Sequence, residues 1–369
     1  MSKPCPNATP EKPQESLALR ARRALDQETR RFAEAEGRGP DEYCDDHRVH
    51  PMAEGRFLST VATMLEIGGF DEAELRIWSE ESVGRLAATA VALDSDRIGW
   101  GLGFGWKEVG ADEPFVITTC IVVEGLKAAS SQIGPAGAAL RDRGLAWLQR
   151  PQREFEVEIG SVRVPTFSPR MRQTPWNVLA AWTSHLEEGD PRRDVVRSLI
   201  TASRVPGLGW CYDSDSMRLD LLHQGYTIAG IEDGLDEDLV LDWILESLAG
   251  FSAPAGWVDK LDIVDEPAAR DLRGRPGFLV HPCGEGRHLV THPSPARAWS
   301  LGESLRLASR RSTDPQLDVA LRRASGSLAE AVLDRLGDEK STRWPRATMH
   351  VLLGLATFIA SRRQSTGAL

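Results

Sequence analysis

Thr118-Thr-Cys-Ile-Val-Val-Glu-Gly-Leu126 is the stretch that decides the fold, because its pattern recurs twice more without a gap. The other copies are His223-Gln-Gly-Tyr-Thr-Ile-Ala-Gly-Ile231 and Ala347-Thr-Met-His-Val-Leu-Leu-Gly-Leu355. Each copy starts with a small or polar residue, runs through about two turns of mainly apolar residues and reaches a glycine–apolar pair. Each also follows a loop rich in Trp, Gly, Pro or Arg. Such a repeat is typical of the inner wall of a helical ring.

Apolar segments alternate with amphipathic ones along the whole chain. The apolar segments are 56–66, 115–129, 175–186, 221–232, 299–310 and 346–361, and the amphipathic ones are 15–35, 71–93, 135–149, 191–203, 236–250 and 315–336. Helices that are apolar nearly all round are buried, whereas amphipathic helices cover them. The alternation therefore predicts an all-α (α/α)6 toroid. The inserts 154–166 and 277–291 alternate like strand pairs and predict small β-hairpins.

The composition favours one folded domain over residues 16–369. Residues 1–15 are rich in proline and polar residues, which predicts a disordered tail. The formal charge of −10 argues against nucleic acid or an anionic membrane as the main partner, because either needs a basic face. Five scattered cysteines fit reduced thiols, and no secretory or membrane-spanning run is visible. We therefore expect a soluble cytoplasmic protein, of unknown oligomeric state.

The loops before the apolar segments carry the candidate binding residues. In a toroid the inner helices run the same way, so these loops gather on one rim of the central cavity. Trp rings stack on sugar faces, and Arg binds hydroxyls, carboxylates or phosphates. The alternative is that these Trp residues plug the ring. The predicted substrate-binding residues are Trp106, Arg170, Trp176, Asn177, Trp210, Tyr212, Trp299, Trp344, Arg346 and His350.

Asp213, Asp215 and His223 are the candidate catalytic residues. Two carboxyl groups in different surroundings can divide acid and base roles, and an imidazole titrating near neutral pH can carry protons. The alternative is that an aspartate caps the helix and the histidine bonds to a neighbouring loop.

No cofactor and no metal are expected. The run His281–His292 is rich in metal-binding residue types, but its spacing matches no common zinc site. The glycine-rich stretch 99–105 lacks the dinucleotide-binding register, and no P-loop is present.

The segments Thr118–Leu126 and His223–Ile231 resemble the inner helices of the terpenoid-cyclase and protein-prenyltransferase toroids. Asp220-Leu-Leu-His223 resembles the prenyltransferase segment that supplies a zinc-binding histidine, although the Asp-x-Cys pair with the other ligands is missing. The Asp-x-Asp-Asp acid motif of class II cyclases is also missing, and Asp213-Ser-Asp215 matches it only in part. This resemblance implies the fold and, as an alternative function, a prenyl- or terpenoid-handling protein.

A closer likeness covers residues 100–232. This region is similar to helical proteins encoded in bacterial polysaccharide gene clusters. The likeness lies in Trp100-Gly-x-x-Phe104-x-Trp106, in Trp176-Asn177, and in Trp210-x-Tyr212 followed by His223. That resemblance implies a bacterial source and a carbohydrate context.

The main interpretation is an enzyme that processes a carbohydrate or glycan as a hydrolase, lyase or epimerase, with a small-molecule or glycan substrate. The alternatives are the prenyl-handling toroid and a scaffold that binds a glycan or protein without catalysis.

Overall fold

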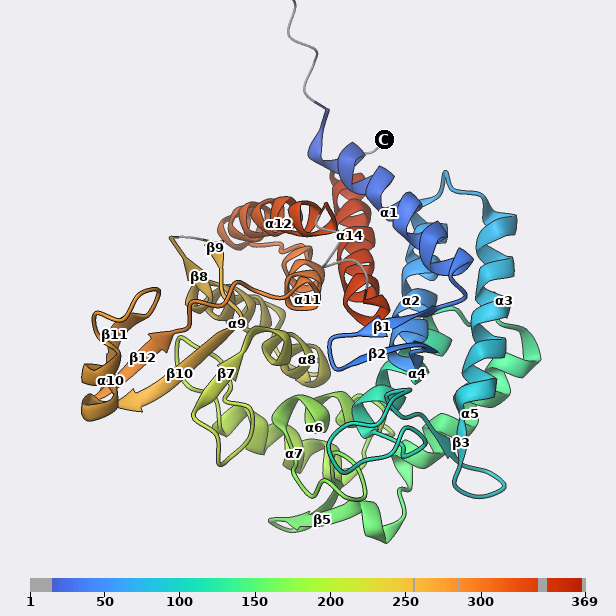
Figure 1. Ribbon diagram of the computed structural model, residues 1–369, viewed down its shortest axis with the longest axis horizontal. Helices are drawn as coiled ribbons and strands as arrows, with labels where there is room; N and C mark the ends of the chain where they lie inside the picture. The colour runs from blue at the N-terminus through green and yellow to red at the C-terminus, as the bar shows by residue number, and fades with distance from the viewer. Residues whose placement is uncertain (1–14, 255, 285, 338–343, 367–369) are drawn as a thin grey trace, which may run out of the picture.

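The computed structural model describes residues 15–254, 256–284, 286–337 and 344–366, so nearly all of the predicted tail 1–15 lies outside the described residues. In this part of the chain, six inner helices form a closed ring (Figure 1). They are α2 (Pro51–Ile67), α4 (Val116–Ala128), α6 (Trp176–Thr183), α8 (Leu221–Ile231), α11 (Ala298–Ala308) and α14 (Pro345–Thr366). Each packs against the next, and α14 packs against α2 to close the ring.

The amphipathic helices form an outer layer. They are α1 (Leu17–Glu34), α3 (Glu72–Thr89), α5 (Gly134–Gln149), α7 (Pro191–Ala202), α9 (Glu237–Gly250) and α12 (Pro315–Leu336). The first outer helix packs against the last inner one, α14, so the two ends of the chain complete one helical pair. The fold is an (α/α)6 toroid, as the alternation predicts.

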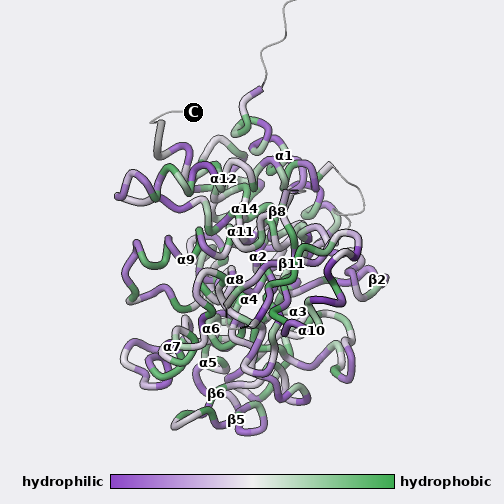
Figure 2. Tube along the Cα trace, turned by 90° about the vertical axis from the view of Figure 1, so that its left-hand side faces the viewer, coloured by the Kyte–Doolittle hydropathy of each residue, from purple (hydrophilic) through white to green (hydrophobic). Residues whose placement is uncertain are grey.

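Burial follows the expected contrast between the layers. Residues Val116–Val123 of α4 are all buried, whereas α7 buries only Val196 and Ile200. In Figure 2 many of the loops at the periphery of the molecule are coloured as hydrophilic. Several outer helices begin at an aspartate whose side chain accepts backbone N–H bonds, as at Asp71 and Asp314, which satisfies N–H groups of the first turn. No helix among the described residues has the length and apolar character needed to cross a membrane.

The glycine that ends each copy of the repeat lies where two inner helices touch. A Cβ at Gly125 would stand 2.1 Å from the carbonyl oxygen of Gly55 in α2, and a Cβ at Gly354 would stand 2.3 Å from that of Gly302 in α11. A Cβ at Gly230 would stand 2.2 Å from the backbone of α6. The repeat is therefore a device for close packing between neighbouring inner helices.

Short strands occur in the connections between the helices of the ring. They are β1 (Arg38–Asp41), β2 (Cys44–Val49), β3 (Val91–Ala92), β4 (Ile98–Gly99), β5 (Glu156–Ile159), β6 (Val162–Pro165), β7 (Arg218–Asp220), β8 (Ser252–Ala253), β9 (Gly256–Trp257), β10 (Lys260–Asp265), β11 (Leu279–Gly284) and β12 (Arg287–Thr291). The predicted hairpins are confirmed as β5–β6 and β11–β12. The second belongs to a larger antiparallel sheet, in the order β11-β12-β10-β7, that the sequence did not predict. This sheet projects from the ring together with α10 (Glu266–Leu272) (Figure 1).

The β1–β2 hairpin, also not predicted, crosses the middle of the ring in Figure 1. Its turn carries Glu42 and Tyr43, which line the two cavities described below.

Candidate functional site

A cavity of ≈ 210 Å³ lies at the amino-terminal ends of the inner helices. Every inner helix contributes to it within its first residues, so the positive ends of the helix dipoles surround the space. Loops and strands supply the rest of the wall. The lining residues are Tyr43, Met52, Leu102, Trp106, Ile117, Phe167, Asn177, Tyr212, Asp220, Leu222, His223, Tyr226, Lys260, Arg297, Trp299 and Arg346.

His223 stands in the first turn of α8. Asp220 caps this helix, because its Oδ1 accepts the backbone N–H groups of Leu222 (3.0 Å) and His223 (3.4 Å). The same oxygen lies 3.7 Å from the imidazole Nδ1, and the ring packs on Tyr212 at a centroid distance of 4.8 Å. The helix start is fixed in turn by β7, where Asp220 pairs with Lys260 of β10.

Burial lowers the pKa of His223, and the charge of Arg297 adds to this effect while Asp220 opposes it. The lowered pKa leaves the imidazole neutral at neutral pH, and a neutral imidazole can accept a proton. Its side chain keeps 24% of its surface accessible in the cavity wall.

Three buried polar atoms of the cavity wall have no hydrogen bond to a described residue. They are Nδ1 of His223, Oδ1 of Asn177 in the first turn of α6, and Nε of Arg297, which has an ion-pair contact with Asp259. An unmet buried polar group costs about 1–3 kcal/mol, which a ligand that bonds it can recover. Nδ1 of His223 faces Oδ1 of Asp220 at 3.7 Å, whereas the amide oxygen of Asn177 is left for a polar ligand.

Aromatic side chains form one wall of the cavity. Trp106 lies between Tyr43 and Phe167, with ring centroids 6.3 Å and 6.1 Å away. These rings offer apolar faces to a ligand, as sugar recognition requires.

Another part of the wall holds Trp299 between two arginines, of which Arg346 also lies 5.7 Å from the ring of Tyr43. The guanidinium carbons of Arg346 and Arg297 lie 4.5 Å and 4.8 Å from the Trp299 ring. Arg346 donates to Asp41 (2.8 Å), and Arg297 pairs with Asp220 Oδ2 (2.8 Å) and with Asp259 Oδ2 (2.7 Å). Both guanidinium charges are therefore compensated by carboxylates.

Lys260 is different, because its ammonium group forms no hydrogen bond or ion pair with any described residue. Its charge acts on His223 and contributes to the lowering of that pKa. The cavity thus combines a neutral base with an uncompensated cation.

Beneath the wall, Tyr226 and His350 form a directed hydrogen-bond chain. Nδ1 of His350 lies 2.7 Å from the carbonyl oxygen of Arg346, so this nitrogen carries the proton and donates it. Nε2 is then the acceptor for the hydroxyl of Tyr226, which lines the cavity. Burial, with the charge of Arg56, lowers the pKa of His350 to about 3 and keeps it neutral.

A buried ion pair network lies close to this chain. Glu303 of α11 accepts from Arg306 at 2.5 Å and lies 3.9 Å from Arg56. Although burial opposes ionisation, these two arginines lower the pKa of Glu303 to about 2. The carboxylate therefore stays charged inside the ring.

The structure places some of the predicted site residues together in the cavity wall and the others elsewhere. The predicted residues that line the cavity are Trp106, Asn177, Tyr212, His223, Trp299 and Arg346. His350 lies behind them, and Trp344 lines a neighbouring cavity.

Among the described residues, the remaining predicted site residues do not line the cavity. Asp213 and Asp215 lie in a loop before α8. Oδ1 of Asp213 accepts the backbone N–H of Asp215, so this carboxylate stabilises the turn of the loop. Arg170 is exposed and pairs with Glu113 (3.1 Å). Trp176 is half-buried at the start of α6.

Trp210 belongs to the core rather than the rim. It is 1% exposed, and its indole N–H donates to the carbonyl oxygen of Ile200 at 2.6 Å. Trp100 is held in the same way by Leu86 (2.8 Å). Both rings fill the space between a loop and the outer helix before it.

Sequence reasoning missed several cavity residues, which are Tyr43, Asp220, Tyr226, Lys260 and Arg297. Tyr226 occupies the same repeat position as His350, so the repeat itself was a signal for it. Tyr43 lies in the turn between β1 and β2, and Lys260 is the first residue of β10, so neither is marked by the apolar pattern of an inner helix. No group of three or more His, Cys, Asp or Glu residues that could hold a metal ion occurs in the described part of the chain.

Comparison with known proteins identifies the fold. No protein-family model and no curated sequence matches the chain. The chain is similar in structure to a sugar epimerase from a ruminal bacterium (TM-score 0.61, 12% identity), with 94% of this chain and 99% of that chain covered. It is also similar to an α-1,6-mannanase, GH76A of Salegentibacter (TM-score 0.57, 10% identity, 94% and 100% covered).

A third similar structure is the type II terpene cyclase MstE from Scytonema (TM-score 0.51, 12% identity, 94% and 100% covered). These proteins share the toroid and act on different substrates, as their names state. At such identities the likeness establishes the (α/α)6 architecture of this chain.

Proposed function

We propose that this protein is a carbohydrate-processing enzyme that transfers a proton at carbon, as an epimerase or a lyase does, with His223 as the base. The observation that carries the proposal is the neutral, partly accessible imidazole of His223 with its unmet Nδ1, placed in an aromatic-walled cavity. The sugar epimerase and the mannanase among the similar structures support a carbohydrate substrate.

The chemistry follows from the groups around the imidazole. Because Nδ1 is buried toward Asp220, Nε2 is the nitrogen that takes a proton from a sugar carbon next to a carbonyl or carboxyl group. The electron pair of the broken C–H bond moves to the adjacent oxygen as an enolate. The ammonium group of Lys260 and the positive helix ends stabilise that charge. For epimerisation, the proton on Nε2 passes to solvent and a water molecule gives a proton to the opposite face of the enolate. For elimination, the electron pair of the enolate reforms the carbonyl and forms a carbon–carbon double bond as the β-substituent leaves, and that leaving group takes the proton from Nε2 or from water.

Asp220 has a positioning role in this scheme. Its Oδ1 lies 3.7 Å from Nδ1 of His223, and active-site hydrogen bonds are often this long before substrate binds. A shorter contact in the complex would stabilise the imidazolium ion that forms when His223 accepts a proton.

Hydrolysis by a carboxyl pair receives less support. Asp213 and Asp215 are outside the described cavity wall, and Asp220 is already bound to Arg297. The terpenoid alternative is also less favoured, because a prenyl substrate needs an apolar chamber. This cavity carries Asp220, Lys260 and Arg346 instead, and its volume suits one small ligand.

The test is proton exchange in D₂O. The protein is incubated with a panel of aldoses, ketoses, uronic acids and their oligomers, and NMR follows loss of C–H signals and appearance of new epimers or unsaturated products. We expect exchange with at least one sugar and a loss of about 10²-fold or more in His223→Gln, the usual contribution of a general base.

The matched control is His281→Asn, which changes an exposed histidine on β11. Exchange at the wild-type rate in His223→Gln would refute the assignment of the base. Sugar binding without exchange would favour the scaffold alternative.

A further inference from the structure

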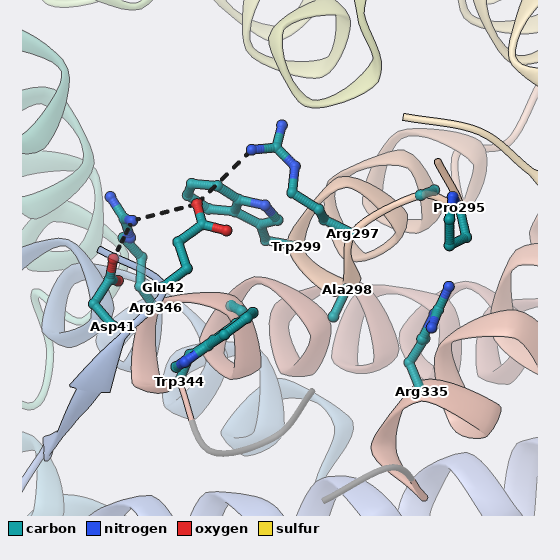
Figure 3. Close-up of a pocket in the computed structure, with 11 residues that line it drawn as sticks. Asp41, Glu42, Pro295, Arg297, Ala298, Trp299, Arg335, Trp344 and Arg346 are labelled. Atoms are coloured by element: carbon teal, nitrogen blue, oxygen red, sulfur yellow. Dashed lines mark hydrogen bonds and ion pairs between the residues drawn. The ribbon is translucent and has the colours of Figure 1, made fainter. Parts of the chain in front are cut away.

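A second cavity adjoins the first. It has a volume of ≈ 180 Å³ and shares Arg297, Trp299 and Arg346 with the central cavity. Its other lining residues are Asp41, Glu42, Pro295, Ala296, Ala298, Arg335, Trp344 and Ala347 (Figure 3).

The partition between the two cavities is well fixed. Trp299 stands between Arg346 and Arg297, as described above. Glu42, from the turn of the β1–β2 hairpin, reaches between the same arginines, with 3.8 Å to Arg297 and 3.9 Å to Arg346 (Figure 3). Tyr43, the next residue, lines the central cavity. The hairpin turn therefore contributes one side chain to each space.

The second cavity has the features of a sugar subsite. Trp344 supplies an aromatic ring, and Pro295, Ala298 and Ala347 supply small apolar surfaces. Arg335 of α12 lies across the cavity from Trp344 in Figure 3 and forms no hydrogen bond or ion pair with a described residue. Its guanidinium group offers N–H donors to a ligand.

The charges favour hydroxyl groups over a phosphate. Asp41 and Glu42 line the cavity and face Arg346 and Arg297, so these two arginines are already compensated. An added anion would lie close to both carboxylates, whereas sugar hydroxyls can donate to the carboxylates and accept from Arg335.

We infer that the substrate is a glycan of at least two linked sugar rings. The reacting ring occupies the central cavity beside His223, and the neighbouring ring occupies the second cavity between Trp344 and Arg335. This inference rests on the proposed function and adds the length of the substrate. Trp299 lines both cavities and contacts the ligand on either side of the linkage.

The experiment compares sugars of different length with the full chain. Exchange rates and saturation-transfer NMR binding are measured for monosaccharides and for the matching di- and trisaccharides. Wild-type protein should prefer the disaccharide by on the order of tenfold in kcat/KM or in Kd, about the effect of one to two good polar contacts. Trp344→Ala and Arg335→Met should abolish that preference and leave the monosaccharide values unchanged within about twofold.

The control is Arg323→Met, which removes an exposed arginine from the same helix α12 and should leave both values unchanged. Equal wild-type values for mono- and disaccharides, or equal losses on both in Trp344→Ala, would overturn the second subsite. If exchange is absent but the disaccharide preference appears in binding and disappears in the variants, the subsite stands and the proposed catalysis fails. Absence of both exchange and binding overturns both.

Discussion

Replacing Gly125 by alanine should destabilise the ring, although alanine is the better helix former. A Cβ at this position would stand 2.1 Å from the carbonyl oxygen of Gly55, more than about 1 Å short of an ordinary contact of about 3.5 Å. The obstacle is backbone, so α2 and α4 must separate. Overpacking costs about 1–3 kcal/mol and more where backbone must move, against about 1 kcal/mol gained in helix propensity.

The matched control is Gly84→Ala, in the exposed interior of α3, where a Cβ would meet nothing within 4 Å. This variant should be more stable than wild type by about 1 kcal/mol. Both variants gain the same helix propensity, so they differ by the overpacking cost, about 1–3 kcal/mol or more. With an m-value near about 3 kcal/mol/M, this separates their urea midpoints by roughly 0.3–1 M or more.

The assay is urea unfolding followed by circular dichroism and by tryptophan fluorescence. Gly354→Ala should behave like Gly125→Ala, since its Cβ would stand 2.3 Å from the Gly302 carbonyl oxygen. A midpoint for Gly125→Ala at or above that of wild type would refute the view that glycine contacts set the spacing of the inner helices.

Three further changes test the site and the core. Because burial lowers the pKa of His223, NMR titration should give a value below 6.5, and Lys260→Met, which removes a cation, should raise it; an unchanged pKa would contradict this electrostatic account. Trp210→Phe should lower the melting temperature through loss of a buried hydrogen bond, about 1–3 kcal/mol, and leave sugar binding intact. A weakened sugar affinity in this variant would show that Trp210 belongs to the binding site after all. Glu303→Gln should cost about 3–5 kcal/mol at pH 7, as measured by urea unfolding, because it removes the carboxylate that the buried Arg306 is bonded to, while Arg56 keeps Glu124. The Glu303 pKa is depressed, so its contribution is complete above about pH 4.5 and falls toward pH 2, where the difference between variant and wild type should narrow.

The inner helices could be predicted because burial on all sides leaves an apolar pattern that needs no tertiary knowledge. The β1–β2 hairpin could not, since β2 reads Cys-Asp-Asp-His-Arg-Val and is mostly exposed. Its turn nevertheless brings Tyr43 to the cavity. Lys260 was missed for a related reason, because only its pairing with Asp220 across two distant strands places it beside His223.

The tryptophans show a different limit of sequence reasoning. Trp210 and Trp299 both precede or begin an inner helix, and local sequence does not separate them. Trp210 turns toward the outer layer because the carbonyl of Ile200 at the end of α7 accepts its N–H. Trp299 stays at the cavity because Arg297 and Arg346 hold both sides of its ring. The distinction depends on partners that are far away in the chain.

The repeat itself separates framework from chemistry. At its second position, the side chains of Thr119 and Gln224 both accept the backbone N–H of the tryptophan in the preceding loop, at 3.0 Å and 2.8 Å. Its eighth position is the contact glycine in every copy. The fourth position varies, with Ile121 in α4 and with Tyr226 and His350 in the other copies. The second and eighth positions hold the ring together, so the fourth position can vary without loss of the framework. On α8 and α14 it carries the polar side chains Tyr226 and His350, which form a hydrogen bond with each other. The proposed chemistry is thus confined to one sector of a ring whose other sectors supply walls.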